Sequence, residues 1–251
     1  MLEVQRISKS FGGVKATDDV SLSFPTGSLT AIIGPNGAGK STFFNLISGA
    51  LRPDTGRILL DETDMVGLSR GEIVHHGIGR AFQVASIFPS LTVEQTLLGA
   101  VTADQGRSGL LGRRFPLPET RERAEAAMTM LGLADQHARL SSELSHGDQK
   151  LLDIALALVL NPKVLLLDEP TAGMGPEERW RMIDKVYELW EREKITVIFI
   201  EHDMDIVFKI APQIAVLCYG RVLASGTPAE IRENAAVIEA YLGTSEEAEA
   251  A

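Results

Sequence analysis

The residues best suited to chemistry stand together in one run, Gly34-Pro35-Asn36-Gly37-Ala38-Gly39-Lys40-Ser41-Thr42. The run fits the pattern G-x-x-x-x-G-K-S/T at every position. Its glycines let the backbone pass close to phosphate oxygens, so that successive N–H groups point at the anion. In this pattern the ammonium of Lys40 reaches the β- and γ-phosphates, and the hydroxyl of Ser41 ligates Mg²⁺. The run therefore predicts a site for a nucleoside triphosphate with magnesium.

The elements on either side of this run fit a phosphate-binding loop. Residues 29–33 read as a buried strand, and the apolar helix face that follows the loop ends at Gly49. A strand, a glycine-rich turn and a helix N-terminus together form a cradle for phosphate. The alternative is a glycine-rich turn that binds nothing, which the complete motif in this setting disfavours.

A pair of carboxylates forms the second candidate group. Residues 164–167 are four apolar side chains suited to a central parallel strand, and Asp168 and Glu169 follow directly. At the end of a strand beside the phosphate-loop strand, Asp168 would hold the magnesium shell and Glu169 the attacking water. Acids that merely end a strand in solvent are common, but behind a phosphate loop we favour the catalytic interpretation.

A third group, Leu144-Ser145-His146-Gly147-Asp148-Gln149, opens an apolar helix that we expect over residues 151–160. A serine, a glycine and a helix N-terminus form another anion site. Because one chain needs only one triphosphate cradle, we expect this second site to grip the nucleotide of a partner subunit.

The three groups together resemble the ATP-binding subunit of an ABC transporter, whose signature sequence is Leu-Ser-Gly-Gly-Gln. The resemblance covers the chain from its first strands to Leu242. It implies an α/β fold of the P-loop NTPase type, with a mainly parallel core sheet, an antiparallel β subdomain and a helical subdomain insertion. It also implies that Ser145 and Gly147 contact the γ-phosphate across a head-to-tail dimer.

Three further residues take roles from the same resemblance. Gln83, at the end of an expected strand over residues 78–83, matches the glutamine that senses Mg²⁺ and water and faces the permease. His202, after a buried strand, matches the histidine that contacts the γ-phosphate, and Phe11 stands where an aromatic residue stacks on adenine. The implied catalytic set is Glu169, His202, Gln83 and Lys40, and the implied metal ligands are Ser41, Gln83 and Asp168.

Two departures from the family pattern stand out. The signature has His146 where the first glycine is usual and Asp148 where glutamine is usual. The family varies at the position before the essential glycine, so we expect an intact site. After Thr171 the usual aspartate of the dimer-contact loop is missing and Gly175 stands there, which leaves communication across the dimer without its usual residue.

Composition limits the partners. The chain has 251 residues, of which 45% are hydrophobic and 23% charged, as is ordinary for a soluble globular protein. A net charge of −10 argues against nucleic acid or anionic lipid as a direct partner. The single cysteine, Cys218, fits a reducing compartment. Neither a bilayer-spanning apolar run nor a signal peptide is evident, so if the chain works at a membrane, another protein must hold it there. The resemblance implies that it lies on the cytoplasmic face of the cell membrane, held by the permease.

We expect a single ATPase domain over residues 1–243. Its catalytic core takes residues 1–92 and 161–243, and a helical subdomain occupies about residues 93–160. The small acidic tail, residues 244–251, is expected to be disordered.

Hydrophobic patterns place the remaining elements. Strands are expected over residues 4–8, 20–24, 57–61, 196–200, 214–217 and 221–224, and helices over residues 121–131, 176–193, 228–233 and 236–242. The longest of these helices should bury one face that carries Trp180, Ile183 and Trp190.

Several longer stretches are similar to the ATP-binding subunits of bacterial branched-chain amino acid importers. They are residues 80–83, 87–94, 169–176, 201–204 and 240–243. The resemblance implies two transmembrane permease subunits, a second ATP-binding subunit (homologous or identical) and, indirectly, a periplasmic substrate-binding protein. The same subfamily includes importers of urea, short amides and other small acids, so the substrate stays open among these.

Two other function classes are alternatives to a transport ATPase that uses ATP and Mg²⁺. A soluble ABC ATPase of DNA repair would insert long coiled coils, whereas the helical insertion here is short and lacks sustained heptads, which leaves cluster assembly as the soluble alternative. A protein that uses nucleotide only as a switch would not need both Glu169 and His202.

Overall fold

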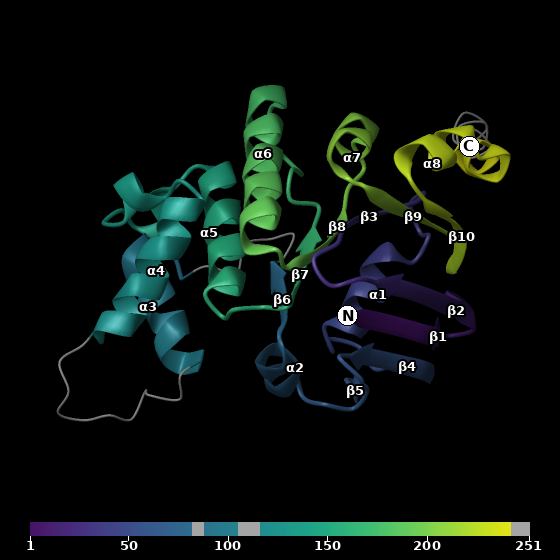
Figure 1. Ribbon diagram of the computed structural model, residues 1–251, viewed down its shortest axis with the longest axis horizontal. Helices are drawn as coiled ribbons and strands as arrows, with labels where there is room; N and C mark the ends of the chain where they lie inside the picture. The colour runs from purple at the N-terminus through teal and green to yellow at the C-terminus, as the bar shows by residue number, and fades with distance from the viewer. Residues whose placement is uncertain (82–87, 105–115, 242–251) are drawn as a thin grey trace. The chain divides into compact units, whose positions relative to one another are not determined.

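The computed structural model describes residues 1–81, 88–104 and 116–241 (Figure 1). The chain divides into two compact units. The first unit comprises Met1–Ile73 with Lys194–Ala251, and the second unit comprises Val74–Glu193. Each unit has its own paired strands and its own buried apolar side chains.

An antiparallel sheet in the first unit has the strand order β2-β1-β4-β5. Its strands are β1 (Leu2–Phe11), β2 (Val14–Phe24), β4 (Thr55–Leu60) and β5 (Thr63–Asp64). Gly12 and Gly13, with φ of +52° and +91°, make a tight turn that lets β1 and β2 run longer than their apolar patterns predict. Leu2, Val4 and Ile7 of β1 are buried, with exposures of at most 2%.

A parallel sheet segment in the first unit positions the phosphate loop. β3 (Leu29–Ile33) pairs in parallel with β8 (Thr196–Ile200) on one side and β9 (Gln213–Cys218) on the other. Every residue of β3 and β8 is buried, as expected for strands covered on both faces. β10 (Arg221–Gly226) adds an antiparallel edge strand beside β9. Because β3 and β8 are parallel neighbours, the segments that follow them leave the sheet at the same edge.

Short helices join the strands of the first unit. They are α1 (Lys40–Ile47), α7 (Met204–Ile210), α8 (Pro228–Glu233) and the helical residues 235–241, while α2 (Arg70–His76) crosses into the second unit. α7 begins where the Asp203 carboxylate accepts N–H groups of the first turn. A capping box between Thr227 and Glu230 starts α8 at the residue that the sequence predicts.

The second unit combines a parallel strand pair with longer helices. The strands are β6 (Ile78–Ala81) and β7 (Val164–Asp168), and the helices are α3 (Val93–Asp104), α4 (Pro118–Met130), α5 (His146–Leu158) and α6 (Pro176–Glu193). α3, α4 and α5 pack against one another (Figure 1), and α5 also packs on β6 and α6. Short 3-10 turns at Ala134–Gln136 and Ser141–Glu143 lead from α4 to α5.

α6 has the bounds that its sequence predicts, but its buried stripe is displaced from the predicted one. The buried side chains are Met182, Ile183, Val186 and Leu189. Trp180 and Trp190, which the pattern placed on this face, are only partly buried. The ring of Trp190 packs against that of Tyr187, with centroids 5.4 Å apart, so the large rings cover the edge of the stripe.

The expected α/β architecture, with a parallel core and an antiparallel sheet, is confirmed, while some local expectations differ. The helix expected over residues 151–160 begins earlier, at His146, because the Ser145 hydroxyl accepts the Asp148 N–H and caps it there. The sequence pattern does not predict α2 and α7, because each helix has only seven residues, less than two turns of apolar periodicity. The predicted strand end at Gln83 lies outside the described residues, as do residues 242–251.

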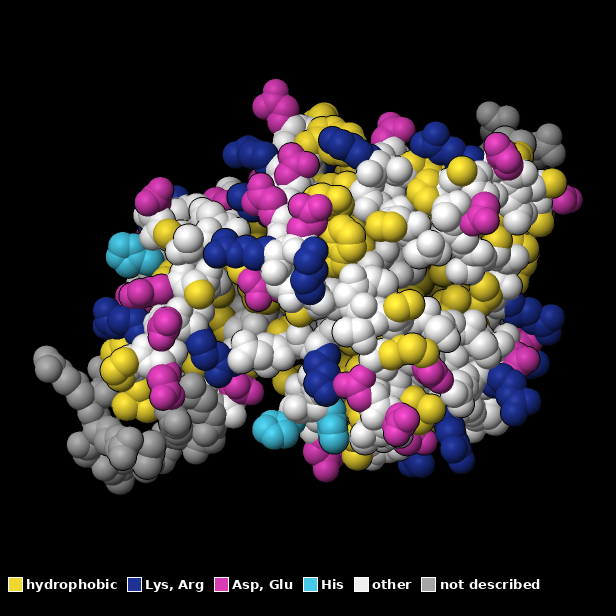
Figure 2. All heavy atoms as spheres, in the orientation of Figure 1, with side chains coloured by type: hydrophobic (Ala, Val, Ile, Leu, Met, Phe, Trp, Pro, Cys, Tyr) yellow, Lys and Arg dark blue, Asp and Glu magenta, His cyan; other side chains and the backbone are white. Residues whose placement is uncertain are grey.

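Acidic and basic side chains are interspersed over the face shown in Figure 2. The acidic excess of the sequence therefore does not gather into one patch on that face. Among the helices of the described ranges, none is both long and apolar enough to cross a membrane.

Candidate functional site

The phosphate loop runs from the end of β3 to the start of α1 and lies against backbone on two sides. A Cβ added to Gly34 would come within 2.0 Å of the Leu217 carbonyl oxygen in β9. A Cβ added to Gly39 would come within 2.1 Å of the Ala16 carbonyl oxygen in β2. Gly37 also has a positive φ, +77°, but a Cβ there would meet nothing within 4 Å. Two positions of the loop thus exclude any side chain, whereas Gly37 is favoured by its backbone conformation alone.

Lys40 and Ser41 stand in the first turn of α1. The Lys40 residue is 7% exposed, and its ammonium donates to the carbonyl oxygens of Gly34 (2.6 Å) and Pro35 (3.0 Å). The charge therefore lies within the loop, where a phosphate oxygen could replace a carbonyl oxygen as acceptor. Ser41 is exposed at the helix N-terminus, where its hydroxyl could ligate a cation held by the phosphates.

Two distant segments support the phosphate loop, and sequence analysis found neither. The Gly220 N–H, in the turn between β9 and β10, donates to the Ala38 carbonyl oxygen (3.1 Å). Near the C-terminus, burial raises the pKa of Tyr241 to about 12, an effect that its hydrogen bond with the backbone of Gly34 partly offsets and that Cys218 reinforces. An aromatic residue in the helix expected over residues 236–242 is the sequence signal that could have pointed to this second support.

His202 leaves the sheet at the same end as the phosphate loop, because it follows β8, the parallel neighbour of β3. The residue is exposed, and its N–H donates to the Glu201 Oε2 (3.1 Å). Phe11 ends β1 and is 46% exposed, with the Lys9 ammonium 5.8 Å from its ring centroid. The first unit therefore brings the phosphate loop and His202 to one sheet edge, and it leaves the Phe11 ring accessible for stacking.

In the second unit, Asp168 ends β7 with its carboxylate paired to Arg80. The Arg80 Nη2 lies 2.7 Å from the Asp168 Oδ2, and the two side chains are 9% and 8% exposed. The strand register explains the pair: Arg80 lies opposite Leu166, so it shares a sheet face with the residue two positions further along β7. The sequence pattern predicts the carboxylate but not its partner. An arginine within an otherwise apolar and glycine-containing strand is the signal that could have found it.

Glu169 follows with φ of +50°, a left-handed conformation that residues with a Cβ seldom adopt. Its carbonyl oxygen accepts the Ala172 N–H (3.1 Å), which closes a turn after β7. The residue is partly exposed, so its carboxylate can meet water. Backbone conformations of this kind persist only where the surrounding structure holds them in place. They are found often at functional sites.

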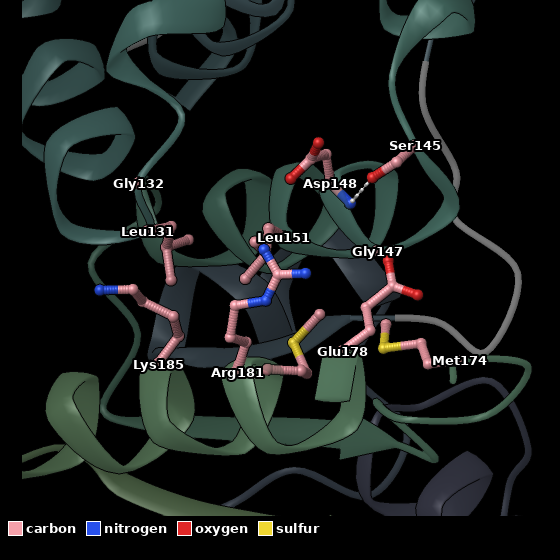
Figure 3. A pocket seen from close by; sticks show the side chains of 11 residues that line it. Leu131, Gly132, Ser145, Gly147, Asp148, Leu151, Met174, Glu178, Arg181 and Lys185 are labelled. Carbon is pink, nitrogen blue, oxygen red and sulfur yellow. Dashed lines mark hydrogen bonds between the residues drawn. The ribbon is translucent and has the colours of Figure 1, made fainter. Parts of the chain in front are cut away.

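The N-terminus of α5 adjoins a pocket of about 210 Å³ in the second unit (Figure 3). Ser145 is exposed there, and its hydroxyl accepts the Asp148 N–H (3.1 Å). A Cβ added to Gly147 would come within 2.3 Å of the Glu178 Oε1, so the carboxylate of Glu178 from α6 would have to move to admit a side chain there. In Figure 3, Glu178 and Arg181 extend from α6 toward α5. The remaining lining includes Leu131, Leu151, Met174, Met182 and Lys185.

The two departures from the expected pattern lie close to each other in this unit. A Cβ added to Gly173, whose φ is +80°, would come within 3.2 Å of the His146 Nε2. The imidazole that replaces a glycine in the signature therefore packs on the loop that follows Glu169. Gly175, which replaces an aspartate, has no atom within 4 Å of an added Cβ, so nothing in this unit fills that position.

A magnesium site would draw on few protein ligands. The described residues hold no cluster of three or more His, Cys, Asp or Glu side chains that could bind a metal. Magnesium bound with a triphosphate takes most of its ligands from phosphates and water, so a hydroxyl and a carboxylate suffice. Ser41 and Asp168 each offer one such group within their own unit, while Gln83, the third predicted ligand, lies outside the described residues.

Two family profiles match this chain. A profile described as "ABC transporter" matches residues 17–172. A second profile, described as "Branched-chain amino acid ATP-binding cassette transporter", matches residues 221–247. The two matches cover the phosphate loop, the signature, both carboxylates and the C-terminal segment that contains Tyr241.

Similar proteins and structures extend over nearly the whole chain. The high-affinity branched-chain amino acid transport ATP-binding protein LivG of Escherichia coli (strain K12) is 38% identical over 250 residues, which cover 97% of this chain and 98% of the relative. BraF of Pseudomonas aeruginosa, described in the same words, is 36% identical over 250 residues, with the same coverage. The ADP conformation of MJ1267, an ATP-binding cassette of an ABC transporter, has a TM-score of 0.84 at 34% identity and covers 97% of this chain and 98% of that chain. The dimeric post-hydrolysis state of MJ0796, bound to ADP and Pi, has a TM-score of 0.76 at 25% identity, with 91% and 99% covered.

Alanine at Gly39 should disrupt the phosphate loop far more than alanine at Gly37. Both residues have positive φ, so both variants carry a backbone penalty of roughly 1 to 2 kcal/mol. Only the methyl group at position 39 collides with a carbonyl oxygen. Titration with a fluorescent nucleoside triphosphate should show an affinity loss of about 100-fold or more for Gly39→Ala and about tenfold or less for Gly37→Ala. Equal losses would contradict the packing argument.

Arg80→Met should destabilise the protein by about 3 to 5 kcal/mol, because it leaves the buried Asp168 carboxylate without its partner. The double variant Arg80→Met/Asp168→Leu removes both charges and should recover most of this loss. Urea unfolding of the single variants and the double variant measures the coupling between the two side chains. Additive losses would show that the two groups do not stabilise each other.

Proposed function

The chain belongs to the ABC transporter family of ATP-binding subunits, and from this premise we propose that it powers a bacterial importer of branched-chain amino acids. As a member of that family it is an ATPase. The proposal for the substrate class is supported by the LivG and BraF relatives and by the match of residues 221–247. Nothing in the proposal requires this chain to touch the transported molecule, whose recognition we assign to a permease and a periplasmic binding protein.

One observation carries the proposed chemistry: one chain holds both a complete phosphate loop and a strand that ends at Asp168 and is followed directly by Glu169. The loop keeps backbone N–H groups and Lys40 within reach of phosphate, which suits binding of a triphosphate. The partly exposed carboxylate of Glu169, beyond the buried Asp168, suits activation of water. A protein that only bound nucleotide would not need this second group.

We assign one role to each group in the hydrolysis. Glu169 accepts a proton from the attacking water while the water oxygen bonds to the γ-phosphorus and the bond to the bridging oxygen of ADP breaks. Lys40, His202 and the backbone N–H groups of the loop stabilise charge that develops on the γ-phosphate oxygens. Mg²⁺, when bound, neutralises charge on the phosphates, and we assign its protein ligands as Ser41, Gln83 and Asp168. Phe11 stacks on the adenine ring.

The proposed working unit is a head-to-tail dimer. The phosphate loop of one chain and the Ser145–Gly147 segment of the other enclose each ATP, so that ATP closes the dimer. Exposure of Ser145 at the N-terminus of a 13-residue helix supports this assignment, because a partner's phosphate can approach it. The dimeric structure of the similar MJ0796 cassette supports it further. The second subunit is either identical or homologous.

The proposed partners place the chain at the cytoplasmic face of the membrane. Residues 83–92 transmit the closing movement of the dimer to two transmembrane permease subunits. Within the chain, we divide the ATPase domain of residues 1–243 into a catalytic core (1–92 and 161–243) and a helical subdomain of about residues 93–160. Hydrolysis then removes the γ-phosphate contacts and reopens the dimer.

Glu169→Gln should keep the affinity for ATP, trap a closed dimer and lower kcat by about 100-fold or more, since an amide cannot accept the proton. Steady-state ATP hydrolysis and size-exclusion chromatography with ATP measure the two effects. Hydrolysis at the wild-type rate would overturn the assignment of the base.

Tagged Glu169→Gln protein with ATP should capture two hydrophobic permease subunits and a second ATP-binding subunit from detergent-solubilised membranes. Lys40→Ala is the control, because a chain that cannot hold the triphosphate should not form the trapped state. Mass spectrometry identifies the partners, and uptake by the reconstituted complex compares leucine with urea. Recovery of soluble partners alone would keep the ATPase and exclude the transporter, whereas uptake of urea alone would correct the substrate class.

A further inference from the structure

A buried lysine connects α5 to the residue proposed as the catalytic base. Lys150 is 4% exposed, and its ammonium donates to the carbonyl oxygens of Glu169 and Ala172, at 2.9 Å each. All three residues belong to the second unit. A lysine is rarely buried to this degree unless its charge meets acceptors, and two of the acceptors here are backbone carbonyl oxygens of one loop.

The loop that Lys150 holds is conformationally demanding. Glu169 has φ of +50°, which is unfavourable for a residue with a Cβ. Its carbonyl oxygen accepts two hydrogen bonds, from Lys150 Nζ and from the Ala172 N–H. Two donors on one carbonyl oxygen fix the plane of the peptide that follows Glu169, and this plane limits the direction of its Cα–Cβ bond. Lys150 thereby influences the direction of the Glu169 side chain through the backbone.

Lys150 lies on the same helix as the residues proposed to bind the partner's nucleotide. Ser145, at the N-cap of α5, and Gly147, in its first turn, are the groups proposed to meet the partner's nucleotide. Lys150 lies five positions after Ser145 on the same continuous helix, about 7.5 Å along its axis. A helix of this length moves as a rigid body, so a displacement at its N-terminus also moves the lysine.

A purely structural role is the simpler alternative. In that case Lys150 only satisfies two loop carbonyls, and its loss lowers stability without a selective effect on hydrolysis. Two facts favour the wider role: one acceptor is the carbonyl of Glu169 itself, and the donor comes from the helix that begins at the signature.

We propose that Lys150 is a positioning residue, which orients Glu169 for attack by water and links this orientation to contact at the N-terminus of α5. The proposal rests on the function proposed above for Glu169 and Ser145. When the partner's nucleotide seats on α5, Lys150 carries the shift of the helix to the Glu169 peptide. Hydrolysis then depends on closure because the base is aligned only when the signature is engaged.

Three variants separate this role from a structural one. Lys150→Met keeps the side-chain length and removes the donors, Lys150→Arg keeps donors, and Lys163→Met repeats the first change at an exposed lysine just before β7. Lys150→Met should lower kcat by about tenfold or more and change the affinity for ATP by less than about twofold, because misalignment affects the reacting geometry rather than ground-state binding. Lys150→Arg should restore at least about a third of the wild-type kcat, and Lys163→Met should match wild type.

A double-mutant cycle tests whether Lys150 acts through Glu169. Single-turnover hydrolysis is measured for Lys150→Met in the wild-type and in the Glu169→Gln background. If the lysine acts only by aligning the carboxylate, the Lys150→Met substitution should lower the rate by less than about twofold in the Glu169→Gln background, where the carboxylate is absent. Equal effects in both backgrounds, or a wild-type rate for Lys150→Met alone, would overturn the proposal while leaving Glu169 as the base. A wild-type rate for Glu169→Gln alone would overturn the base assignment and this proposal together.

Hydrogen exchange provides a readout that does not depend on hydrolysis. The Ala172 N–H shares the Glu169 carbonyl oxygen with Lys150, so its protection reports the order of the loop. In nucleotide-free protein, Lys150→Met should speed exchange of this amide by about tenfold relative to Lys163→Met. Unchanged exchange would show that the lysine does not hold the loop, and would contradict the proposal even for a variant with low activity.

Discussion

The phosphate loop leaves room only for hydrogen atoms where Gly34 and Gly39 meet the carbonyl oxygens of Leu217 and Ala16. This close approach holds the turn between β3 and α1 against β9 and β2, so the loop cannot widen or shift by itself. Because these positions carry no side chain, a polyanion can approach the backbone of the loop closely. The parallel pairing of β3 with β8 then brings His202 to the same edge. The first unit is thus built around one turn that glycine alone can make.

The second unit depends on buried charges rather than on glycines alone. Arg80 and Asp168 pair across adjacent strands, and Lys150 holds the turn that contains Glu169. A buried charge is stabilising only when it meets a partner in good geometry. Arg80 therefore helps to fix the position of Asp168, and Lys150 helps to fix the position of the Glu169 peptide. The two carboxylates at the end of β7 therefore have different surroundings. Asp168 is enclosed by an ion pair, whereas Glu169 is partly exposed and held through its backbone.

Much of the fold and most candidate residues could be predicted because their signals are local. The bounds of β3, β8, α6 and α8 follow from apolar runs, caps and a leading proline within a few residues. What these local signals did not define depends on contacts between distant segments. Arg80 and Asp168 are 88 positions apart in the sequence, and the register of their two strands brings them together. Tyr241 contacts Gly34 because the C-terminal segment folds back onto the phosphate loop. The proximity of His146 to Gly173 belongs to the same class, since in the sequence His146 looked like an isolated departure from the family pattern.

The central claim is that ATP is enclosed between the phosphate loop of one chain and the signature helix of another. Cys218 is the only cysteine, so a Cys218→Ser chain can carry one new thiol at the exposed Asn36 or at the exposed Ser145. Mixing Asn36→Cys chains with Ser145→Cys chains, both with Glu169→Gln, and oxidising them measures the approach of the two surfaces. The account predicts a disulfide-linked dimer that forms with ATP and not without it. Crosslinking that is equal with and without ATP, or absent in both, would contradict it.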